Sequence, residues 1–327
     1  MANRIEFHQH GGPEVLRWAP YDVEQPKETE IIVRHHAIGL NYIDTYVRSG
    51  LYPVNQFPSG LGTEAAGEVV AVGSQVTRFQ VGDRIVYCQS GLGAYSDYHH
   101  VDQSKAVILP DSISYQSAAA SFLKGLTVYY LFHMTHKVQS GETVLLHAAA
   151  GGVGLIACQW AKALGANLIG CVSSENKAQR AREAGAWATI NTSQDDIVKR
   201  VHELTSGQKV PVVYDSVGKA TWQTSLDCLQ PRGLLVSFGN ASGPVTGVDL
   251  AILNQKGSLF VTRPSLNGYL TTPELLDQAS ATLFSLISDG KIDVSVPESQ
   301  QFPLRDAAKA HRSLESRTTS GACLLIP

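Results

Sequence analysis

The segment from Val144 to Lys177 constrains the fold of this 327-residue chain more than any other segment. It begins with a short apolar run, passes through the small-residue turn Ala149-Ala150-Gly151-Gly152-Val153-Gly154, and continues into an apolar, helix-forming stretch that Gly165 ends. A second apolar run follows at 167–172. A strand, a glycine-rich turn, a helix and a second strand in this order predict a βαβ unit within a parallel sheet.

The turn in this unit is suited to hold a phosphate group. A helix that starts directly after a strand presents unpaired backbone N–H groups and the positive end of its dipole, so it stabilises a pyrophosphate without a cationic side chain. Gly151 lets the backbone approach the phosphates, and Gly154 lets the helix lie close to the strand. Ala149 stands where the usual fingerprint has its first glycine. The segment therefore predicts a dinucleotide site.

The residues after the second strand indicate which dinucleotide binds. Enzymes that use NAD usually place an acidic residue there, which accepts hydrogen bonds from the ribose 2′-OH and repels a 2′-phosphate. This chain has two hydroxyls, Ser173 and Ser174, followed by the ammonium of Lys177, and these groups suit a phosphate ester. We therefore predict NADPH. The alternative is that Lys177 is only a solvated residue of the first helical turn and that Glu175 is the acidic residue.

Size and composition predict a two-domain globular protein. A chain of 327 residues exceeds what one core normally holds, and a hydrophobic content of 43% with 17% charged residues is ordinary. The net charge of −3 gives no cationic surplus for nucleic acid or an anionic membrane. The first residues contain no apolar signal segment, and no run of 18 apolar residues occurs, so we expect a cytoplasmic location. Five scattered cysteines favour reduced, packed thiols.

The pattern along the chain changes near residue 117. Before it, dense Gly and Pro punctuation separates short β-rich runs, which predicts a compact β domain. After it, strands alternate with helices, which predicts a parallel sheet. Near the C-terminus, Thr272-Pro273-Glu274 supplies a cap, a first-turn proline and an acid for a helix that Gly290 stops. A helix near Leu304 to Ser316 and a strand at 322–326 complete the prediction.

Several segments together resemble the medium-chain dehydrogenase/reductases, and within them the quinone oxidoreductases related to zeta-crystallin. The resemblance covers essentially the whole chain. It implies an α/β fold with a doubly wound parallel Rossmann sheet, a β-rich GroES-like catalytic domain and a cleft between them. The implied domains are 1–125 with 265–327 for catalysis and 126–264 for NADPH. The segments that carry the resemblance are 41–46, 50–53, 60–67, 81–84, 149–154 and 213–218.

The zinc ligands of related alcohol dehydrogenases are absent. Asn41, Thr63 and Leu123 stand where that branch has a cysteine, a histidine and a second cysteine. An amide, a hydroxyl and an alkyl group do not provide the thiolate and imidazole set that binds tetrahedral Zn²⁺. We therefore expect no metal, and a hydride acceptor that is already electrophilic, such as a quinone or an α,β-unsaturated carbonyl.

The resemblance also assigns candidate site residues. It places Asn41, Tyr46, Tyr52 and Arg263 at the edge of the acceptor pocket. Arg317 matches a family arginine that contacts the 2′-phosphate, and Thr192 replaces a tyrosine near the adenine. Because ligands of a doubly wound sheet lie beyond the carboxyl ends of its strands, three strand ends should line the nicotinamide half. The further cofactor contacts expected are Ile43, Asp44, Thr127, Gly151, Gly152, Val153, Ser216, Val217, Phe238, Gly239, Asn240, Ala241, Val261 and Thr262, together with Asn41 and Arg263.

Three functions remain open at this stage. The first is an NADPH-dependent quinone reductase that works by hydride, or stepwise electron, transfer without metal. The second is an NADPH-dependent enone or enal double-bond reductase. The third is a non-catalytic cofactor-binding or RNA-contacting protein like some crystallins, against which the acidic balance of charge argues. The resemblance also implies a homodimer formed through edge strands of the cofactor sheets.

Overall fold

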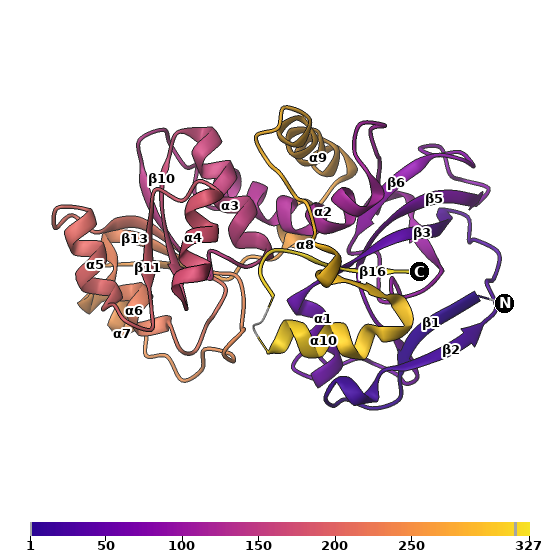
Figure 1. Cartoon of the computed structure of the whole chain (residues 1–327), viewed down its shortest axis with the longest axis horizontal. Helices are drawn as coiled ribbons and strands as arrows, with labels where there is room; N and C mark the ends of the chain where they lie inside the picture. Colours follow the sequence, from indigo (N-terminus) through magenta and orange to yellow (C-terminus); the bar gives the residue numbers. More distant parts are fainter. Residues whose placement is uncertain (1, 317–318) are drawn as a thin grey trace. The chain divides into compact units, whose positions relative to one another are not determined.

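The computed structural model of the chain describes residues 2–316 and 319–327 (Figure 1). Within these residues the chain forms two compact units. Unit 1 consists of Met1–Lys124 and Thr271–Pro327, and unit 2 of Gly125–Leu270. The chain therefore leaves the first unit, builds the second, and returns.

Unit 2 contains a six-stranded sheet in which all neighbouring strands are parallel. The strand order is β11-β10-β9-β12-β13-β14, so the order reverses between β9 and β12. This is the doubly wound arrangement that the alternation of strands and helices predicted, and the prediction is confirmed. The strands are β9 Thr143–His147, β10 Asn167–Val172, β11 Ala188–Asn191, β12 Val210–Asp215, β13 Leu229–Ser237 and β14 Phe260–Thr262.

Helices connect these strands, and α3 packs against α4 while α5 packs against α6 (Figure 1). The core beneath them is made of fully buried aliphatic side chains such as Leu145, Ile169 and Val213. Burying strands on both faces requires such continuous apolar runs, which is why these segments lack the alternation of a half-exposed strand. The helices are α3 Gly152–Leu164, α4 Glu175–Glu183, α5 Ile197–Leu204, α6 Trp222–Asp227, α7 Ala251–Gln255 and α8 Leu266–Tyr269, with the short π-helix η3 Leu131–Thr135.

Unit 1 is built on two sheets. The larger has seven strands in the order β15-β16-β3-β5-β6-β8, with β7 also paired to β3, and the smaller has the order β2-β1-β4. Neighbours are antiparallel except β15 and β16. The strands are β1 Ala2–Phe7, β2 Arg17–Tyr21, β3 Glu30–Leu40, β4 Ser59–Gly60, β5 Glu64–Val72, β6 Arg84–Cys88, β7 Tyr98–Asp102, β8 Ala106–Ile108, β15 Gln301–Pro303 and β16 Cys323–Ile326.

Helices close unit 1, and α2 (Tyr115–Tyr130) begins in it. Helix α9 (Pro273–Ser288) starts as predicted, with the Thr272 hydroxyl accepting a hydrogen bond from the N–H of Leu275. The helix expected near Leu304 to Ser316 is shorter, because a 3₁₀ turn at Leu304–Asp306 precedes α10 (Ala307–Glu315). The remaining 3₁₀ turns are η1 Pro13–Val15, η2 Gln103–Lys105 and η4 Glu298–Gln300.

One helix contradicts the sequence prediction. Residues before about 120 were expected to form strands and turns only, yet α1 spans Tyr42–Ser49. Its signal was present in the sequence: Asn41 is a good N-cap, and Asp44 at the third helical position accepts a hydrogen bond from the Asn41 N–H at 2.8 Å. The helix is short and lies among β-strands, so its capping pattern was not recognised from the sequence.

All five cysteines of the chain are buried and free of disulfides. Cys88 and Cys323 lie in unit 1, and Cys158, Cys171 and Cys228 lie in unit 2. Burial raises the pKa of each thiol, to about 12 for Cys158. The cysteines therefore act as small apolar packing residues, as the sequence predicted.

Candidate active site

The glycine-rich turn of unit 2 is shaped by the close approach of a helix. Gly151 is the N-cap of α3 and has no side chain to cap it, so the first N–H groups of the helix point at whatever lies before it. A Cβ on Gly154 would lie 2.4 Å from the carbonyl oxygen of Ala148 and 2.5 Å from the carbonyl carbon of Ala149. Only glycine at this position lets the helix lie directly on the turn.

Ala149 stands at the position of the first glycine of the fingerprint, and its methyl group fits there without a steric clash. It is fully buried, and its methyl group faces Gly170 of β10, where an added Cβ would lie only 2.6 Å from it. The N–H of Ala149 donates to the carbonyl of Cys171 at 3.1 Å. Gly170 therefore provides the space that the alanine methyl needs, and the turn keeps its shape.

Ser173, just after β10, and Lys177 in α4 are the two residues that we expect to contact the adenosine ribose. The ammonium of Lys177 lies 3.4 Å from the hydroxyl of Ser173, and the hydroxyl of Ser174 caps α4. Glu175, the alternative acid, instead pairs with Arg182 along α4 at 2.5 Å. This exposed ion pair turns one carboxylate oxygen of Glu175 toward the C-terminal part of α4. The local geometry therefore favours the hydroxyl and ammonium groups as the ribose-side contacts.

The carboxyl ends of β12 and β13 are organised by a buried carboxylate. Asp215 accepts hydrogen bonds from the N–H groups of Val217 and Gly218 at 2.7 and 3.0 Å, and from the hydroxyls of Thr221 and Ser225 at 2.7 and 2.8 Å. These bonds hold the loop after β12 in place. Asp215 is a structural support here, because its side chain is saturated by protein donors.

The loops after β12 and β13 pack closely together. A Cβ on Gly239 would lie 2.3 Å from the carbonyl oxygen of Ser216, and the N–H of Ala241 donates to that same oxygen at 3.2 Å. Arg263, just after β14, donates to the carbonyl of Ser237 at 2.7 Å. Unit 2 thus gathers at one edge of its sheet the predicted contacts Ser216, Val217, Phe238, Gly239, Asn240, Ala241, Val261, Thr262 and Arg263.

Thr192 and Thr127 are two further predicted cofactor contacts that belong to unit 2. Thr192 is exposed just after β11, and its N–H donates to the carbonyl of Val172 at 2.8 Å. Thr127 lies on the part of α2 that belongs to unit 2. Arg317 lies outside the described residues.

In unit 1, helix α1 presents an aromatic row. The rings of Tyr42 and Tyr46 have centroids 5.9 Å apart, and those of Tyr46 and Tyr52 are 5.4 Å apart and nearly perpendicular. The N–H of Tyr52 donates to the carbonyl of Tyr46 at 3.0 Å, which fixes the loop after the helix. The structure therefore brings together the predicted Tyr46 and Tyr52, and adds Tyr42, which sequence reasoning missed despite its i, i+4 spacing from Tyr46.

Asn41, at the start of α1, is held by a buried ion pair. Its amide nitrogen donates to Glu64 Oε2 at 2.7 Å, and Glu64 also accepts from the Leu123 N–H at 2.6 Å and from the Lys124 ammonium at 3.4 Å. Glu64 is fully buried and Lys124 is 5% exposed. A Cβ on Gly39 would lie 2.1 Å from the Glu64 carboxylate, so that glycine makes room for it.

This arrangement determines which end of the Asn41 amide is available to a ligand. The carboxylate of Glu64 accepts hydrogen bonds and cannot donate, so the amide group against it must be the NH₂. The second amide hydrogen faces the carbonyl of Gly39 at 3.4 Å. Asn41 is therefore suited to offer its carbonyl oxygen as an acceptor, and not to donate to a developing oxyanion.

Two of the three zinc-ligand positions, Asn41 and Leu123, donate to the Glu64 carboxylate, and the three do not fit a zinc ion. Asn41 gives its N–H groups to protein acceptors, and Leu123 contributes an alkyl side chain and a backbone N–H. The Thr63 hydroxyl is buried without a hydrogen-bond partner. Throughout residues 2–316 and 319–327, no group of three or more His, Cys, Asp or Glu residues is placed to hold a metal.

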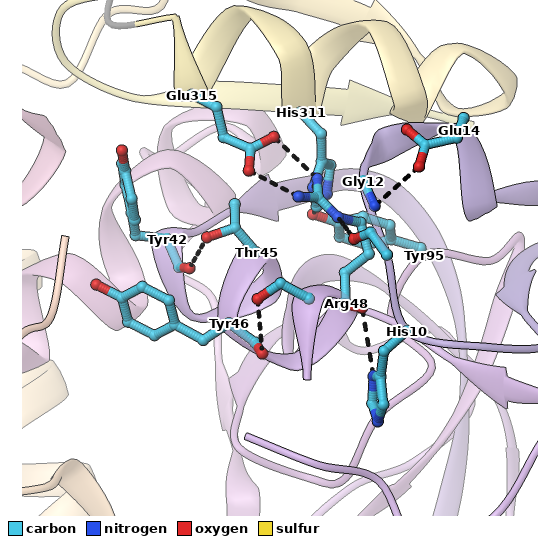
Figure 2. A network of polar contacts seen from close by, with 12 residues as sticks. His10, Gly12, Glu14, Tyr42, Thr45, Tyr46, Arg48, Tyr95, His311 and Glu315 are labelled. Atoms are coloured by element: carbon cyan, nitrogen blue, oxygen red, sulfur yellow. Dashed lines mark hydrogen bonds and ion pairs between the residues drawn. The ribbon is translucent and has the colours of Figure 1, made fainter. Parts of the chain in front are cut away.

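A chain of hydrogen bonds leads from α10 to α1 (Figure 2). Arg48 pairs with Glu315 at 2.6 Å and donates a hydrogen bond to His311 Nδ1 at 2.9 Å. Because Nδ1 of the neutral His311 ring accepts, the ring proton lies on Nε2. Nε2 is 3.2 Å from the Tyr95 oxygen. The Tyr95 hydroxyl in turn donates to Asp44 Oδ2 at 2.9 Å. Burial is the main reason that the pKa of Asp44 is raised to about 7 and that of His311 is lowered to about 3.

Sequence reasoning found Asp44 but missed the residues around it. Glu64 follows Thr63 and Lys124 follows Leu123, and both Thr63 and Leu123 stand at zinc-ligand positions of the related alcohol dehydrogenases. This adjacency in the sequence could have pointed to Glu64 and Lys124. Tyr95 and His311 gave none, because their partners lie 51 and 216 residues away along the chain.

Comparison with known proteins agrees with this geometry. Residues 27–111 match the family model of the alcohol dehydrogenase GroES-like domain, and residues 152–283 match that of the zinc-binding dehydrogenases. The quinone oxidoreductase of Salmonella typhimurium is 64% identical over all of both chains. The crystal structure of Escherichia coli quinone oxidoreductase complexed with NADPH superimposes with a TM-score of 0.99 at 63% identity, over 99% of this chain and 100% of that one.

A second kind of relative is more distant. The 2-haloacrylate reductase of a Burkholderia species is 43% identical, with 98% of each chain covered. High identity over the full length, together with both matched domains, shows that this chain belongs to the quinone oxidoreductase family of the medium-chain dehydrogenase/reductases.

Proposed function

We propose that this protein is an NADPH-dependent quinone reductase. The observation that carries the proposal is the end of β10, where Ser173 and Lys177 lie together while Glu175 is held by Arg182. This arrangement favours a 2′-phosphate over a free 2′-OH. Relatives that are 59% to 64% identical are named quinone oxidoreductases, and the Escherichia coli quinone oxidoreductase, at 63% identity, was crystallised with NADPH.

Each unit would supply one part of the machinery. In unit 2, the N-terminus of α3 would hold the pyrophosphate, Ser173 and Lys177 the 2′-phosphate, and the loops after β12, β13 and β14 the nicotinamide half. We assign the cofactor to this unit and the acceptor to unit 1. Arg317 would add a second cation at the 2′-phosphate.

When bound, NADPH supplies the hydride. The tyrosine row of α1 offers rings that stack on a flat acceptor and hydroxyls that donate to an oxygen gaining charge. Asn41 would orient a donor group of the ligand through its carbonyl oxygen. These residues position the two reactants and need no metal ion for that task.

An NADPH-dependent enone or enal reductase is the second candidate. The 43% identity to a 2-haloacrylate reductase favours it, since that enzyme's name describes an activated double bond as the substrate. Hydride addition to either acceptor leaves charge on an oxygen that the same tyrosines could stabilise.

A panel of quinones and enones, assayed by loss of NADPH absorbance, separates the two. We expect the higher kcat/KM with quinones. A higher kcat/KM with enones would assign the protein to the second class, and tight NADPH binding without turnover of either would refute both.

We also propose a cytoplasmic homodimer. Across the described residues, no helix is long and apolar enough to cross a bilayer. Edge strand β14 leaves Phe260 59% exposed and Val261 38% exposed, and pairing with a second copy would cover both the side chains and the strand edge. Light scattering should give the mass of two chains for the protein and of one chain for Phe260→Asp.

A further inference from the structure

The turn before α3 contains a residue in an unfavourable backbone conformation. Ala148, directly after β9, has a φ of 57°, in the left-handed region that residues other than glycine rarely adopt. Ala148 is exposed, so burial of its own methyl group does not hold it there. A backbone strained in this way persists only where its surroundings fix it, and such residues gather at ligand sites.

The residues on both sides of Ala148 are fixed. Ala149 is fully buried, and its N–H donates to the carbonyl of Cys171 in β10 at 3.1 Å. On the other side, His147 is the last residue of β9, and its Nε2 lies 3.0 Å from the hydroxyl oxygen of Ser225 in α6. A side-chain contact therefore adds an anchor to the backbone pairing of β9.

The directions of the hydrogen bonds show what His147 contributes. The hydroxyl of Ser225 donates its one hydrogen to Asp215 Oδ2 at 2.8 Å. The oxygen of Ser225 can then only accept from His147, so Nε2 carries the ring proton. Burial lowers the pKa of His147 more than the nearby Asp215 raises it, so the ring is neutral at pH 7. His147 is thus a fixed donor in a chain of hydrogen bonds that ends on a buried carboxylate.

This chain continues the connection between two neighbouring strands beyond their backbone pairing. The last backbone pair between β9 and β12 is Leu146 with Tyr214. His147 and Asp215 come next along the two strands, and Ser225 bridges their side chains. The strand order reverses between β9 and β12, and ligands of doubly wound sheets lie beyond the strand ends at such a point. The bridge therefore fixes the relative position of the two strand ends there.

We propose that His147 is a positioning residue for the cofactor. Bonded through Ser225 to the carboxylate, it keeps Ala148 in the left-handed conformation, so that the N–H groups at the start of α3 face the pyrophosphate. This inference rests on the proposed function, which places the pyrophosphate at that helix. Every contact in the chain of hydrogen bonds lies within unit 2. The buried imidazole acts on the shape of the turn and not on the ligand.

Two ligands separate this role from a general loss of stability. NADPH has a pyrophosphate, whereas adenosine 2′-monophosphate has the adenine and the 2′-phosphate without it. Without the anchor, Ala148 should leave the left-handed region in most molecules, and the apparent affinity for a pyrophosphate falls with the fraction that stays competent. We expect His147→Leu to bind NADPH about tenfold more weakly, with unchanged affinity for adenosine 2′-monophosphate, by titration calorimetry of the folded protein.

Two further variants test the hydrogen bond itself. In His147→Gln the side-chain amide can donate from near the position of Nε2, so most of the NADPH affinity should return. Ser225→Ala breaks the chain at its middle and should weaken NADPH binding as His147→Leu does. Ser121→Ala is the matched control, because Ser121 is also fully buried but donates to the carbonyl of Ser117 in its own helix at 2.7 Å. It should leave the affinity for both ligands unchanged.

Ala148→Gly tests the backbone strain. Glycine adopts a positive φ without a steric cost, so the turn should then no longer depend on the anchor. The double variant His147→Leu with Ala148→Gly should therefore recover NADPH affinity, although its melting temperature should stay as low as that of His147→Leu. A role of His147 in stability alone gives no reason for this recovery.

Equal loss of both ligands in His147→Leu, or a loss of NADPH that Ala148→Gly does not recover, would overturn the inference. If His147→Leu does not fold, Ser225→Ala takes its place in both comparisons. The proposed function fails separately, by an absence of quinone and enone reduction. A protein without that activity but with this pattern of binding would refute only the function, and a wild type that does not bind NADPH would refute both.

Discussion

The two units build their candidate functional residues on different foundations. Unit 2 uses backbone: the N–H groups at the start of α3, a glycine that admits the helix, and loops at the end of a parallel sheet. Unit 1 uses buried side chains from distant parts of the chain, such as Asn41, Glu64 and Lys124. A backbone site tolerates side-chain changes but not changes of shape. A site of buried charges should be sensitive to the loss of one charged side chain.

The largest effect on the free energy of unfolding is expected when a buried charge in unit 1 loses its ion-pair partner. Glu64→Gln leaves the buried ammonium of Lys124 uncompensated, which typically costs about 3–5 kcal/mol of unfolding free energy. Calorimetry should show a lower melting temperature, while NADPH affinity in the folded protein should hold. The double variant Glu64→Gln with Lys124→Met should recover part of the loss. A melting temperature equal to the wild type's would show that this pair does not support unit 1.

A shape change in unit 2 should act on cofactor binding. In Gly154→Val the new side chain meets the backbone at Ala148 and Ala149, and overpacking of this kind costs about 1–3 kcal/mol. We expect NADPH affinity to fall by up to about a hundredfold, measured by fluorescence titration. Gly268→Ala is the control, since that glycine is exposed and an added Cβ would come no closer than 3.3 Å to the Ser265 hydroxyl. Unchanged affinity in Gly154→Val would contradict the proposed role of the turn.

Acid should destabilise unit 1. Burial is the main cause that lowers the pKa values of His35, His99 and His311 to about 3, 4 and 3, so the unfolded chain binds more protons than the folded one below about pH 6.5. Each histidine then removes about 1.4 kcal/mol of unfolding free energy per pH unit. Asp44, with its pKa raised to about 7, has the opposite sign, because its contribution is greatest at low pH and is lost as the pH rises. Three histidines should outweigh it.

The measurement is the melting temperature between about pH 6.5 and 5, which lies within the window between the unfolded and folded pKa values of these histidines. We expect it to fall steadily on acidification. A constant or rising melting temperature in this range would mean that the buried histidines are not kept neutral by the fold.

The smallest effect should come from the exposed end of the cofactor site. Lys177→Ala removes one charge-assisted contact to a 2′-phosphate, so the preference for NADPH over NADH should narrow by about tenfold, or about 1.4 kcal/mol. NADH affinity itself should barely change. Lys199→Ala on α5, which replaces an exposed lysine of unit 2, is the control. Equal loss of both cofactors in Lys177→Ala would place the 2′-phosphate elsewhere.

The same contrast explains what the sequence could predict. The doubly wound sheet, the glycine-rich turn before α3 and the cap of α9 rest on local patterns, and the structure confirms these elements. The cluster around Asp44 depends on Glu64, Tyr95 and His311, which meet only after the chain has folded. Polar residues spaced so far apart carry no periodic signal. The contacts assigned to NADPH itself remain predictions, including Arg317, which lies outside the described residues.

The burial of every cysteine has a consequence for the chemistry proposed here. Quinones and enones are soft electrophiles to which thiolates add, so a protein that binds them risks alkylation of its own thiols. Only the thiolate form reacts readily. Because all five thiols are buried and their pKa values are raised, they present little thiolate to such compounds. The packing that fills both cores therefore also shields these thiols from such electrophiles.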